Sequence, residues 1–342
     1  MTKREVVLQT LRFESPPYVP WHVEPTIECA RRLREHLGVE DLSGFLDNHF
    51  VNVNSTIGRF DPVDADHVRD VYGVVWDRRV DKDIGTPVQW PIRTPADLDR
   101  TDWPDPADPA WYAGIPRLLA ESPDRFSRYT LGFSLYERAW TMRGMTDLLM
   151  DMIERPGFVA EFMDRIVEHN LVQVHKALEL GVDCVHFGDD YGMQTGLIMG
   201  IDLWRQFIKP RLARMFAPVV AAGKVVSMHS CGRVQELFDD LVGIGLNLFN
   251  PFQPEVMDVF ATMPRFHGRL AFHGGMSIQK TLPFGTVEEV RDMAARLLAA
   301  GAAGGYVFSP SHDVPYDVPP ENFVAMMDVL KAQPGRADAA SG

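Results

Sequence analysis

Cysteine is scarce in this chain of 342 residues. The three cysteines, Cys29, Cys184 and Cys231, are odd in number and far apart in the sequence. A small secreted domain that depends on disulfides carries an even set of more closely spaced cysteines. We therefore expect reduced thiols and a cytoplasmic protein.

Long apolar runs and concentrated positive charge are also missing. No segment approaches the roughly 20 consecutive apolar residues that cross a bilayer. The first residues, "MTKREVVLQTLRF", carry charges but lack the apolar core of a secretory signal. The formal net charge is -13, and no cluster of Lys and Arg is present that could follow a phosphate backbone. The sequence thus disfavours membrane-spanning and nucleic-acid-binding proteins.

The glycine-rich turns of nucleotide-binding folds are absent as well, because neither GxGxxG nor GxxxxGK[ST] occurs. A doubly wound open sheet usually carries such a turn after its first strand, so a closed barrel is favoured over that rival. Short apolar runs alternate with amphipathic helices, which is typical of a parallel sheet covered on both faces. The predicted strands are 18–23, 50–54, 128–133, 182–190, 224–230, 247–252, 270–275 and 304–310. They predict an α/β fold, a TIM-type (β/α)8 barrel.

The chain is expected to form one domain over residues 1–333. The segment 58–124 is rich in Pro, Asp and Trp and is predicted to be an N-terminal insertion that contains a hairpin. Residues 334–342 are predicted to be a disordered tail.

A histidine and a cysteine stand at the end of one predicted strand, where a barrel places its reactive groups. His229 and Cys231 are two residues apart, so on an extended chain both side chains point the same way. Zinc accepts both donors but needs three or four ligands, and His312, Asp189 and Glu137 are candidates to complete the set. The alternative is that Cys231 is a small buried apolar residue and His229 a hydrogen-bonded rim residue.

Two carboxylates are adjacent in "GDDYG" (188–192). Asp189 and Asp190 project to opposite sides of an extended chain, so at most one is expected in the cavity and the other on the surface or at a helix cap. Asp189 is the candidate for a base, a ligand or a partner of a cationic substrate. Glu137 is either a site residue or a favourable charge at a helix N-terminus.

Four further polar residues lie at or next to predicted strand ends and are candidates for substrate binding. They are His22, Tyr191, Asn250 and His273. His273 is equally consistent with a packed core histidine.

Several motifs together resemble the uroporphyrinogen decarboxylase-like (URO-D) superfamily. They are "HSCG" (229–232), "FGDDYG" (187–192) and "NPFQPEVMD" (250–258), supported by "FHGGMSIQKTLPFGT" and "DVPPENF". The resemblance runs over about residues 1–331 and implies a TIM-type barrel.

The N-terminal region separates two branches of this superfamily. Uroporphyrinogen decarboxylases carry an arginine-rich motif of the type RQAGRY, which grips the carboxylates of the substrate. This chain has "YVPWHVEPTIECARRLREHLG" there, and Arg31, Arg32 and Arg34 do not reproduce the motif. A polycarboxylate substrate requires several arginines in its cleft, so decarboxylation of a tetrapyrrole is disfavoured.

The chain looks more like the zinc-dependent methyltransferases, which hold zinc with a His-x-Cys pair and a later cysteine. His229 and Cys231 match the pair, whereas "SPSHDVPYD" stands in place of the later cysteine and makes His312 the expected third ligand. A set with one thiolate suits Lewis-acid activation of a methoxy or amine substrate about as well as activation of a thiol.

The resemblance therefore implies a zinc enzyme that moves a methyl group between a small molecule, such as a methoxy compound in O-demethylation, and a corrinoid protein. Cobalamin would belong to that partner, and a homodimer is possible. Two alternatives remain: a metal-free decarboxylase acting on a carboxylated small molecule or a tetrapyrrole, and a non-catalytic binding barrel. Bound metal, the arginine content of the cleft and the spacing of the three candidate ligands distinguish them.

Overall fold

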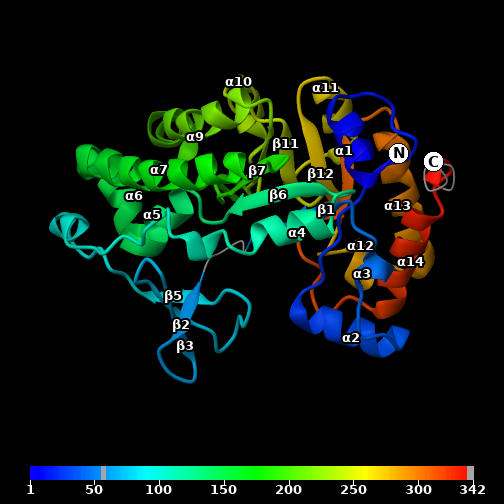
Figure 1. Ribbon diagram of the computed structural model, residues 1–342, viewed down its shortest axis with the longest axis horizontal. Coiled ribbons are helices and arrows are strands. Elements are labelled where there is room, and N and C mark those ends of the chain that lie inside the picture. Colours follow the sequence, from blue (N-terminus) through cyan, green and yellow to red (C-terminus); the bar gives the residue numbers. More distant parts are fainter. Residues whose placement is uncertain (55–58, 337–342) are drawn as a thin grey trace.

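Seven parallel strands form one curved sheet at the centre of the computed structural model, which describes residues 1–54 and 59–336 (Figure 1). The strand order is β1-β6-β7-β10-β11-β12-β13, so each strand lies beside the next one along the chain within this sheet. The bounds are β1 (Phe50–Asn52), β6 (Phe126–Leu131), β7 (Cys184–Gly188), β10 (Val225–His229), β11 (Leu248–Phe252), β12 (Ala271–Met276) and β13 (Tyr306–Pro310).

Residues 20–22 close this sheet into a barrel. On one side the Phe308 N–H donates to the Pro20 carbonyl (2.9 Å), and on the other the His49 N–H donates to the Trp21 carbonyl (3.1 Å). The first and last strands of the sheet are thus joined through an eighth extended segment. The predicted TIM-type (β/α)8 barrel is confirmed.

The eighth segment is less regular than predicted. Instead of a strand over 18–23, the structure has an isolated parallel bridge between Trp21 and Phe308. Pro20 has no N–H to donate, and the Trp21 N–H is directed at the ring Nδ1 of His49 (3.4 Å) rather than at a carbonyl. The His49 side chain thus replaces a backbone carbonyl as the acceptor of the Trp21 N–H.

Helices cover the outside of the barrel wall, and α8 continues through a π-helical turn, η3, into α9. The helices are α1 (Lys3–Leu11), α2 (Ile27–Leu37), α3 (Ser43–Leu46), α4 (Ile115–Glu121), α5 (Tyr136–Arg143), α6 (Met145–Glu154), α7 (Pro156–Glu179), α8 (Gly200–Leu203), η3 (Trp204–Ile208), α9 (Lys209–Ala221), α10 (Phe238–Gly243), α11 (Val259–Phe266), α12 (Thr281–Phe284), α13 (Val287–Gly301) and α14 (Pro320–Lys331). Short 3-10 turns are η1 (Pro95–Asp99), η2 (Pro109–Trp111) and η4 (Gln235–Leu237). No helix among the described residues has the length and apolarity required to cross a membrane.

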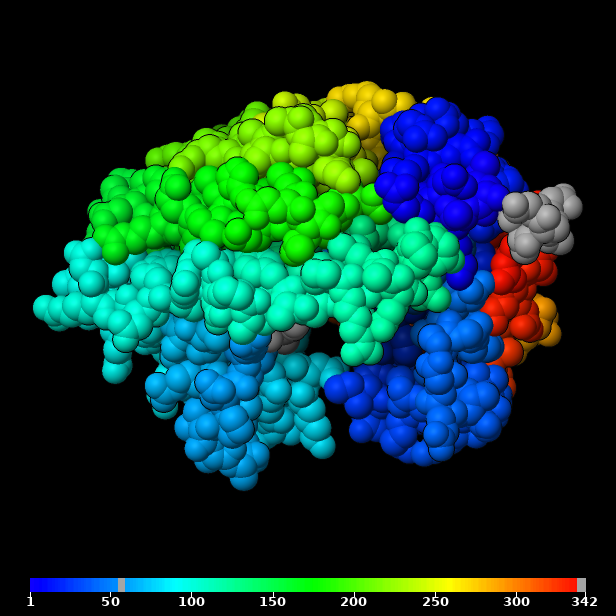
Figure 2. All heavy atoms as spheres, viewed as in Figure 1, coloured from blue at the N-terminus to red at the C-terminus, as the bar shows by residue number. Residues whose placement is uncertain are grey.

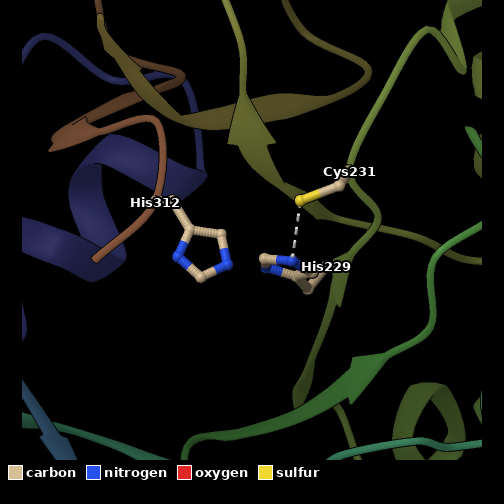
Figure 3. A group of neighbouring side chains, drawn as sticks. All are labelled: His229, Cys231 and His312. Atoms are coloured by element: carbon tan, nitrogen blue, oxygen red, sulfur yellow. Dashed lines mark hydrogen bonds between the residues drawn. The ribbon is translucent and has the colours of Figure 1, made fainter. Parts of the chain in front are cut away.

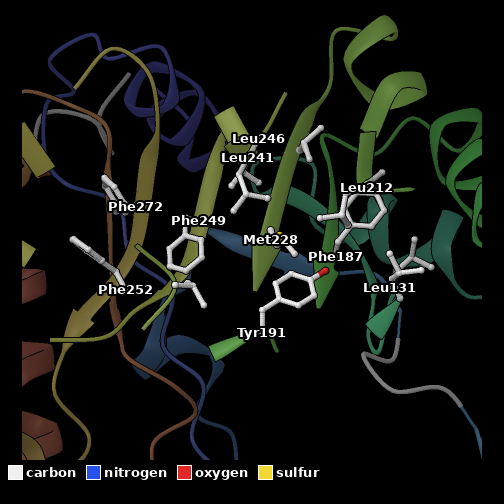
Figure 4. Packing of buried hydrophobic residues seen from close by; sticks show 14 of the residues in the cluster. Leu131, Phe187, Tyr191, Leu212, Met228, Leu241, Leu246, Phe249, Phe252 and Phe272 are labelled. Atoms are coloured by element: carbon white, nitrogen blue, oxygen red, sulfur yellow. The ribbon is translucent and has the colours of Figure 1, made fainter. Parts of the chain in front are cut away.

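The outward faces of the central strands form the main core with these helices (Figure 4). Phe187, Met228 and Phe249 are fully buried and stand side by side in the strand register. The Phe187 ring lies 4.9 Å from that of Phe216 on α9, and the Phe249 ring 4.7 Å from that of Phe238 on α10. These contacts fix the strands, and therefore the side chains at their ends.

The inward faces change from apolar to polar along the barrel axis. At the amino ends of the strands, a buried apolar cluster includes Phe50, Phe126, Cys184, Leu248, Ala271 and Val307. Two positions later the same strands carry Asn52, Arg128, His186, Asn250, His273 and Ser309, which all line a cavity. Because residues two apart on a strand point to the same side, the apolar cluster is the base of the barrel and the polar residues form the cavity floor and wall.

The inserted segment forms a four-stranded antiparallel sheet, where the sequence predicts one hairpin. Its strands are β2 (Phe60–Pro62), β3 (His67–Asp70), β4 (Val75–Asp77) and β5 (Thr86–Gln89). A buried ion pair between Asp70 and Arg138 of α5 (2.8 Å) attaches it to the barrel. A small hairpin, β8 (Gly192–Met193) with β9 (Gly196–Leu197), follows β7.

The predicted boundaries of the insertion and the tail fall partly outside the described residues, at 58 and at 337–342. Just before the tail's last six residues, the Arg336 guanidinium binds the Asp47 carboxylate (2.5 Å).

Candidate active site

A cavity of about 550 Å³ opens at the carboxyl ends of the strands. Its mouth lies between the inserted segment, which contributes Asp81, Asp83 and Ile84, and the start of α2, which contributes Thr26 and Ile27. Figure 2 shows the surface hollowed between these two parts, the inserted segment in light blue and the region of α2 in darker blue. This is the face on which TIM-barrel enzymes carry their active sites.

His229, which lines this cavity, and Cys231 meet at the end of β10 (Figure 3). Cys231 Sγ lies 3.4 Å from His229 Nε2. The strand geometry explains the convergence, since residues i and i+2 project to the same side. The expected pair is therefore present in space.

His312 approaches the pair from the loop that follows β13 (Figure 3). Its ring centroid is 5.5 Å from that of His229. Within residues 1–54 and 59–336, His229, Cys231 and His312 form the one group of potential metal ligands whose donor atoms all lie within 4.8 Å of one another. The three residues that the sequence analysis selected are brought together.

The hydrogen bonds of the two rings determine which nitrogen is available. His229 Nδ1 lies 2.8 Å from Asn250 Oδ1, an acceptor, so Nδ1 carries the proton and Nε2 faces Cys231 with a free lone pair. His312 Nδ1 accepts from the backbone N–H of Asp313 (2.8 Å). A cation at His312 Nε2 requires the proton on Nδ1, so its binding is coupled to the loss of this bond.

The donor set fits zinc in kind and spacing. Tetrahedral zinc holds nitrogen at about 2.0–2.1 Å and sulfur at about 2.3 Å, which places neighbouring donors roughly 3.3–3.8 Å apart. The 3.4 Å between His229 and Cys231 lies within this range. His312 is exposed and can turn toward the pair without disturbing the core.

Burial changes the proton affinities of the pair. Burial and the carboxylates of Asp190 and Glu137 raise the pKa of the Cys231 thiol well above its ordinary value. Burial, with the nearby His312, lowers the pKa of His229. The imidazole is thus a neutral donor, and a bound cation would displace the thiol proton.

Asp190 is the carboxylate beside the pair. Its Oδ1 accepts the Cys231 N–H (2.7 Å) and lies 3.6 Å from His229 Nε2. Glu137, at the start of α5, also lines the cavity. Burial raises the pKa of Glu137 well above its usual range, and the charges of Asp190 and Asp189 add to the effect.

The structure does not bring Asp189 to the cavity. Asp189 is fully buried, and its carboxylate accepts the N–H groups of Tyr136 (2.8 Å) and Glu137 (2.6 Å) at the N-terminus of α5. The Tyr191 hydroxyl donates to the same carboxylate (2.7 Å), and Tyr191 too is buried away from the cavity. Asp189 and Asp190 have different surroundings, and Asp190 is the one that faces the candidate ligands His229 and Cys231.

His22, Asn250 and His273, the other candidates for substrate binding, all line the cavity. Glu24 and His186, two polar residues at or near the ends of predicted strands, line it as well, and so does Arg128, which sequence reasoning overlooked. Arg128 lies inside a strand, and the signal that could have found it is the polar residue two positions after a core residue. Burial alone would raise the pKa of Glu24, but His22, Arg128 and Asn52 lower it to about 2.

Residues 77–333 match the family profile described as uroporphyrinogen decarboxylase (URO-D). A uroporphyrinogen decarboxylase of Chlorobaculum parvum is 22% identical and aligns over 97% of this chain and 99% of its own length. One of Chlorobaculum tepidum is 23% identical over 71% of each chain. Among solved structures, a methyltransferase from Methanosarcina mazei superposes with a TM-score of 0.71 at 16% identity, covering 97% of this chain and 98% of that one. At this identity the structural likeness concerns the fold.

The family match spans most of the chain and contains the cavity wall from Arg128 to Asp313 together with all three candidate ligands. It confirms the resemblance drawn from the "HSCG" and "FGDDYG" motifs. The chain belongs to the uroporphyrinogen decarboxylase (URO-D) family, a family of enzymes.

Proposed function

We propose that this protein is a zinc-dependent methyltransferase that moves a methyl group from a small methoxy, amine or thiol compound to a corrinoid protein. The observation that carries the proposal is the convergence of His229, Cys231 and His312 beside the strand-end cavity, which the two histidines line. Such a set has no evident purpose in a metal-free decarboxylase. The Methanosarcina mazei protein with the same fold is named a methyltransferase, which agrees with this proposal.

The charge of the cavity also favours it over decarboxylation of a polycarboxylate. The acidic residues that line the cavity are Glu24, Asp81, Asp83, Glu137, Asp190 and Asp313, against one arginine, Arg128, among the described lining residues. A substrate with many carboxylates needs several cationic partners. The decarboxylase alternative is supported by the names of the curated relatives, at 22–24% identity.

Zinc held by His229, Cys231 and His312 would supply a Lewis acid that withdraws charge from the heteroatom bearing the methyl group. Asn250 keeps the His229 Nε2 lone pair directed into the cavity. Burial and the charges of Asp190 and Asp189 raise the pKa of Glu137, which favours its protonated form, and that form can donate a proton to the departing heteroatom.

The transfer balances with a reduced corrinoid as the second reactant. The bond between the methyl carbon and the heteroatom breaks, and the heteroatom keeps the electron pair and takes the proton. The Co(I) centre of the corrinoid supplies the pair for the new bond to the methyl carbon. That corrinoid belongs to the partner protein, which we place over the cavity mouth.

The test compares zinc content and methyl transfer in three proteins. The wild type should contain about one zinc per chain and methylate free cob(I)alamin from a methoxy or methylamine donor, followed by the absorbance of the cobalt. Cys231→Ser should lose both the metal and the transfer. Cys29→Ser is the matched control, since Cys29 is a buried thiol on α2 outside the cavity, and it should retain both.

Full methyl transfer by a zinc-free Cys231→Ser protein would contradict the proposal. Release of CO2 from uroporphyrinogen by the wild type, unchanged in Cys231→Ser, would establish the decarboxylase instead.

A further inference from the structure

The floor of the cavity carries a buried cation, Arg128, whose two terminal nitrogens have no hydrogen-bond partner among the described residues. Arg128 on β6 is 6% exposed, in a layer that TIM barrels usually fill with branched apolar side chains. Its Nε donates to Asn52 Oδ1 (2.8 Å). Among the described residues, neither Nη1 nor Nη2 has a hydrogen-bond acceptor, and no carboxylate lies within 4.0 Å of the guanidinium. A buried charge without a close counterion is costly, so this arrangement indicates a missing anionic partner.

Glu24, a carboxylate that lines the same cavity, is committed elsewhere. Glu24 accepts from Asn52 Nδ2 (2.6 Å) and lies 3.3 Å from His22 Nε2. Asn52 therefore stands between the acid and Arg128, donating to the one and accepting from the other. This bridge orients the guanidinium while leaving its two Nη groups free on the cavity side.

A second unpartnered polar group lies in the same floor. His273 on β12 is 1% exposed and lines the cavity, and neither of its ring nitrogens has a hydrogen-bond partner among the described residues. Its ring stacks on Phe50 (5.3 Å between centroids, 12° between planes), and the His22 ring lies 5.5 Å away. The imidazole is thus held in place by packing alone, with its nitrogens available to a ligand.

We propose that Arg128 and His273 form an anion-binding floor that takes a carboxylate group of the methyl donor. A guanidinium presents two parallel N–H groups that match the two oxygens of a carboxylate, and the His273 ring offers a further N–H. Asp81 and Asp83 at the mouth repel anions, so Arg128 is the place in the cavity where a bound anion would be stabilised.

The size of the donor follows from the layers of the barrel. The floor lies about two strand residues below His229, which is roughly 6.6 Å at the usual rise. The His186 ring, on the floor, is 6.4 Å from that of His229. One aromatic ring or a short chain spans this separation, so the donor is a small acid with a methoxy or methylamino group at its other end. The identity of that group rests on the proposed function; the carboxylate does not.

The experiment measures binding of two matched probes, 4-methoxybenzoate and 4-methoxybenzamide, by titration calorimetry. The protein is zinc-free Cys231→Ser, so that the carboxylate cannot be held by the metal. We expect the benzoate to bind at least about tenfold more tightly than the neutral amide, as a bidentate charge-assisted contact provides. Arg128→Met should reduce this preference to within about twofold, Arg128→Lys should retain part of it because the charge remains without the fork, and His273→Phe should weaken it.

Equal binding of the two probes in the unmodified floor would overturn the inference, even if no Arg128 variant folds. A preference that persists in folded Arg128→Met would also overturn it, because the carboxylate would then bind elsewhere. Failure of the methyltransferase proposal is a separate outcome: a wild-type protein without zinc or methyl transfer that still prefers the benzoate keeps the anion-binding floor.

Discussion

Asp189 and Asp190 are consecutive in the chain, yet their carboxylates have different surroundings. Asp189 is sealed beneath α5 by three donors, two backbone N–H groups and the Tyr191 hydroxyl. Asp190 faces the cavity and accepts the Cys231 N–H. The first is positioned to hold the N-terminus of α5, and the second to hold Cys231, a candidate ligand.

Substituting each aspartate by asparagine should separate these roles. Burial raises the pKa of Asp189 to about 7, against the effect of its three donors, so we choose pH 8, where the carboxylate is ionised. Asp189→Asn replaces one acceptor oxygen by an NH2 group and leaves a buried N–H unpaired, which should cost about 1–3 kcal/mol of unfolding free energy. Asp190→Asn keeps an acceptor for Cys231 and should leave stability within about 0.5 kcal/mol while weakening zinc binding.

Urea denaturation and elemental analysis measure the two effects. If Asp190→Asn were the less stable protein, or if Asp189→Asn lost zinc without losing stability, the assignment of the two carboxylates would be reversed. The sequence could predict that the neighbours diverge, because side chains alternate along an extended chain. It could not predict which one turns inward, because that depends on the register of β7 against β6 and β10.

At the scale of elements, the loop after β10 that carries Cys231 is pressed against the loop after β7. Gly232 has φ +84°, and a Cβ added there would lie 2.3 Å from the Gly192 carbonyl carbon. A Cβ on Gly192 would meet the Cys231 carbonyl oxygen at 2.6 Å. Two glycines thus permit the approach that brings Cys231 beside Asp190 and His229.

Gly232→Ala should therefore displace Cys231 and weaken zinc binding, by about tenfold or more if it acts as other residues that support metal ligands do. Gly200→Ala is the matched control. Gly200 also has a positive φ, +74°, but a Cβ there would have no neighbour within 4 Å. Both variants should lose roughly 1–2 kcal/mol of stability from the left-handed backbone. Competition with a chelator measures the affinity, and an equal loss in both variants would show that backbone strain, rather than the contact between the loops, is responsible.

Most of the barrel could be predicted from the sequence. The strand predicted at 224–230 is β10 (Val225–His229), and that at 128–133 is β6 (Phe126–Leu131), displaced by two residues. Runs of buried apolar residues identify such strands, whereas their ends are set by pairing with neighbours. Residues 20–22 differ because Pro20 removes a donor and the His49 ring replaces a carbonyl, and neither effect is visible in a local pattern.

The candidate site was predictable only where it depends on local features of the sequence. The spacing of His229 and Cys231 is a local feature. His312 was one of three candidates to complete the set, and the family resemblance made it the expected third ligand. Arg128 and His186 stand within apolar strands, and only the closed barrel shows that their side chains point inward to one cavity. The polar floor of the cavity therefore depends on the tertiary structure and cannot be read from any one strand.

On the scale of the whole molecule, several buried histidines are neutral in the folded state. Burial lowers the pKa of His49 to about 3 and that of His169 to about 4, and it holds those of His186 and His273 well below the ordinary value. The carboxyl groups of Glu137 and Asp189 oppose this effect, because burial raises their pKa values. As the pH is lowered into mild acid, the buried histidines therefore decrease the stability of the protein, and the buried carboxyl groups increase it.

Removing one histidine should shift this balance by a calculable amount. His169 on α7 is 7% exposed and lies against Tyr72, Trp103 and Trp111, and burial with the nearby Arg138 lowers its pKa to about 4. Between pH 6.5 and 4 the unfolded chain binds a proton that folded His169 does not. The contribution of His169 to the free energy of unfolding therefore decreases by about 1.4 kcal/mol for each unit by which the pH is lowered in this range, whatever the other groups contribute.

His169→Phe keeps the aromatic packing and removes the titration. Its unfolding free energy, relative to that of the wild type, should rise by roughly 3 kcal/mol as the pH is lowered from 6.5 to 4. His175→Phe is the matched control, because it makes the same substitution at an exposed position on the same helix. Urea denaturation at four pH values across this window gives the three curves. A His169→Phe curve parallel to that of the wild type would mean that His169 is protonated in the folded protein, and that the cluster of aromatic rings around it holds an imidazolium rather than a neutral ring.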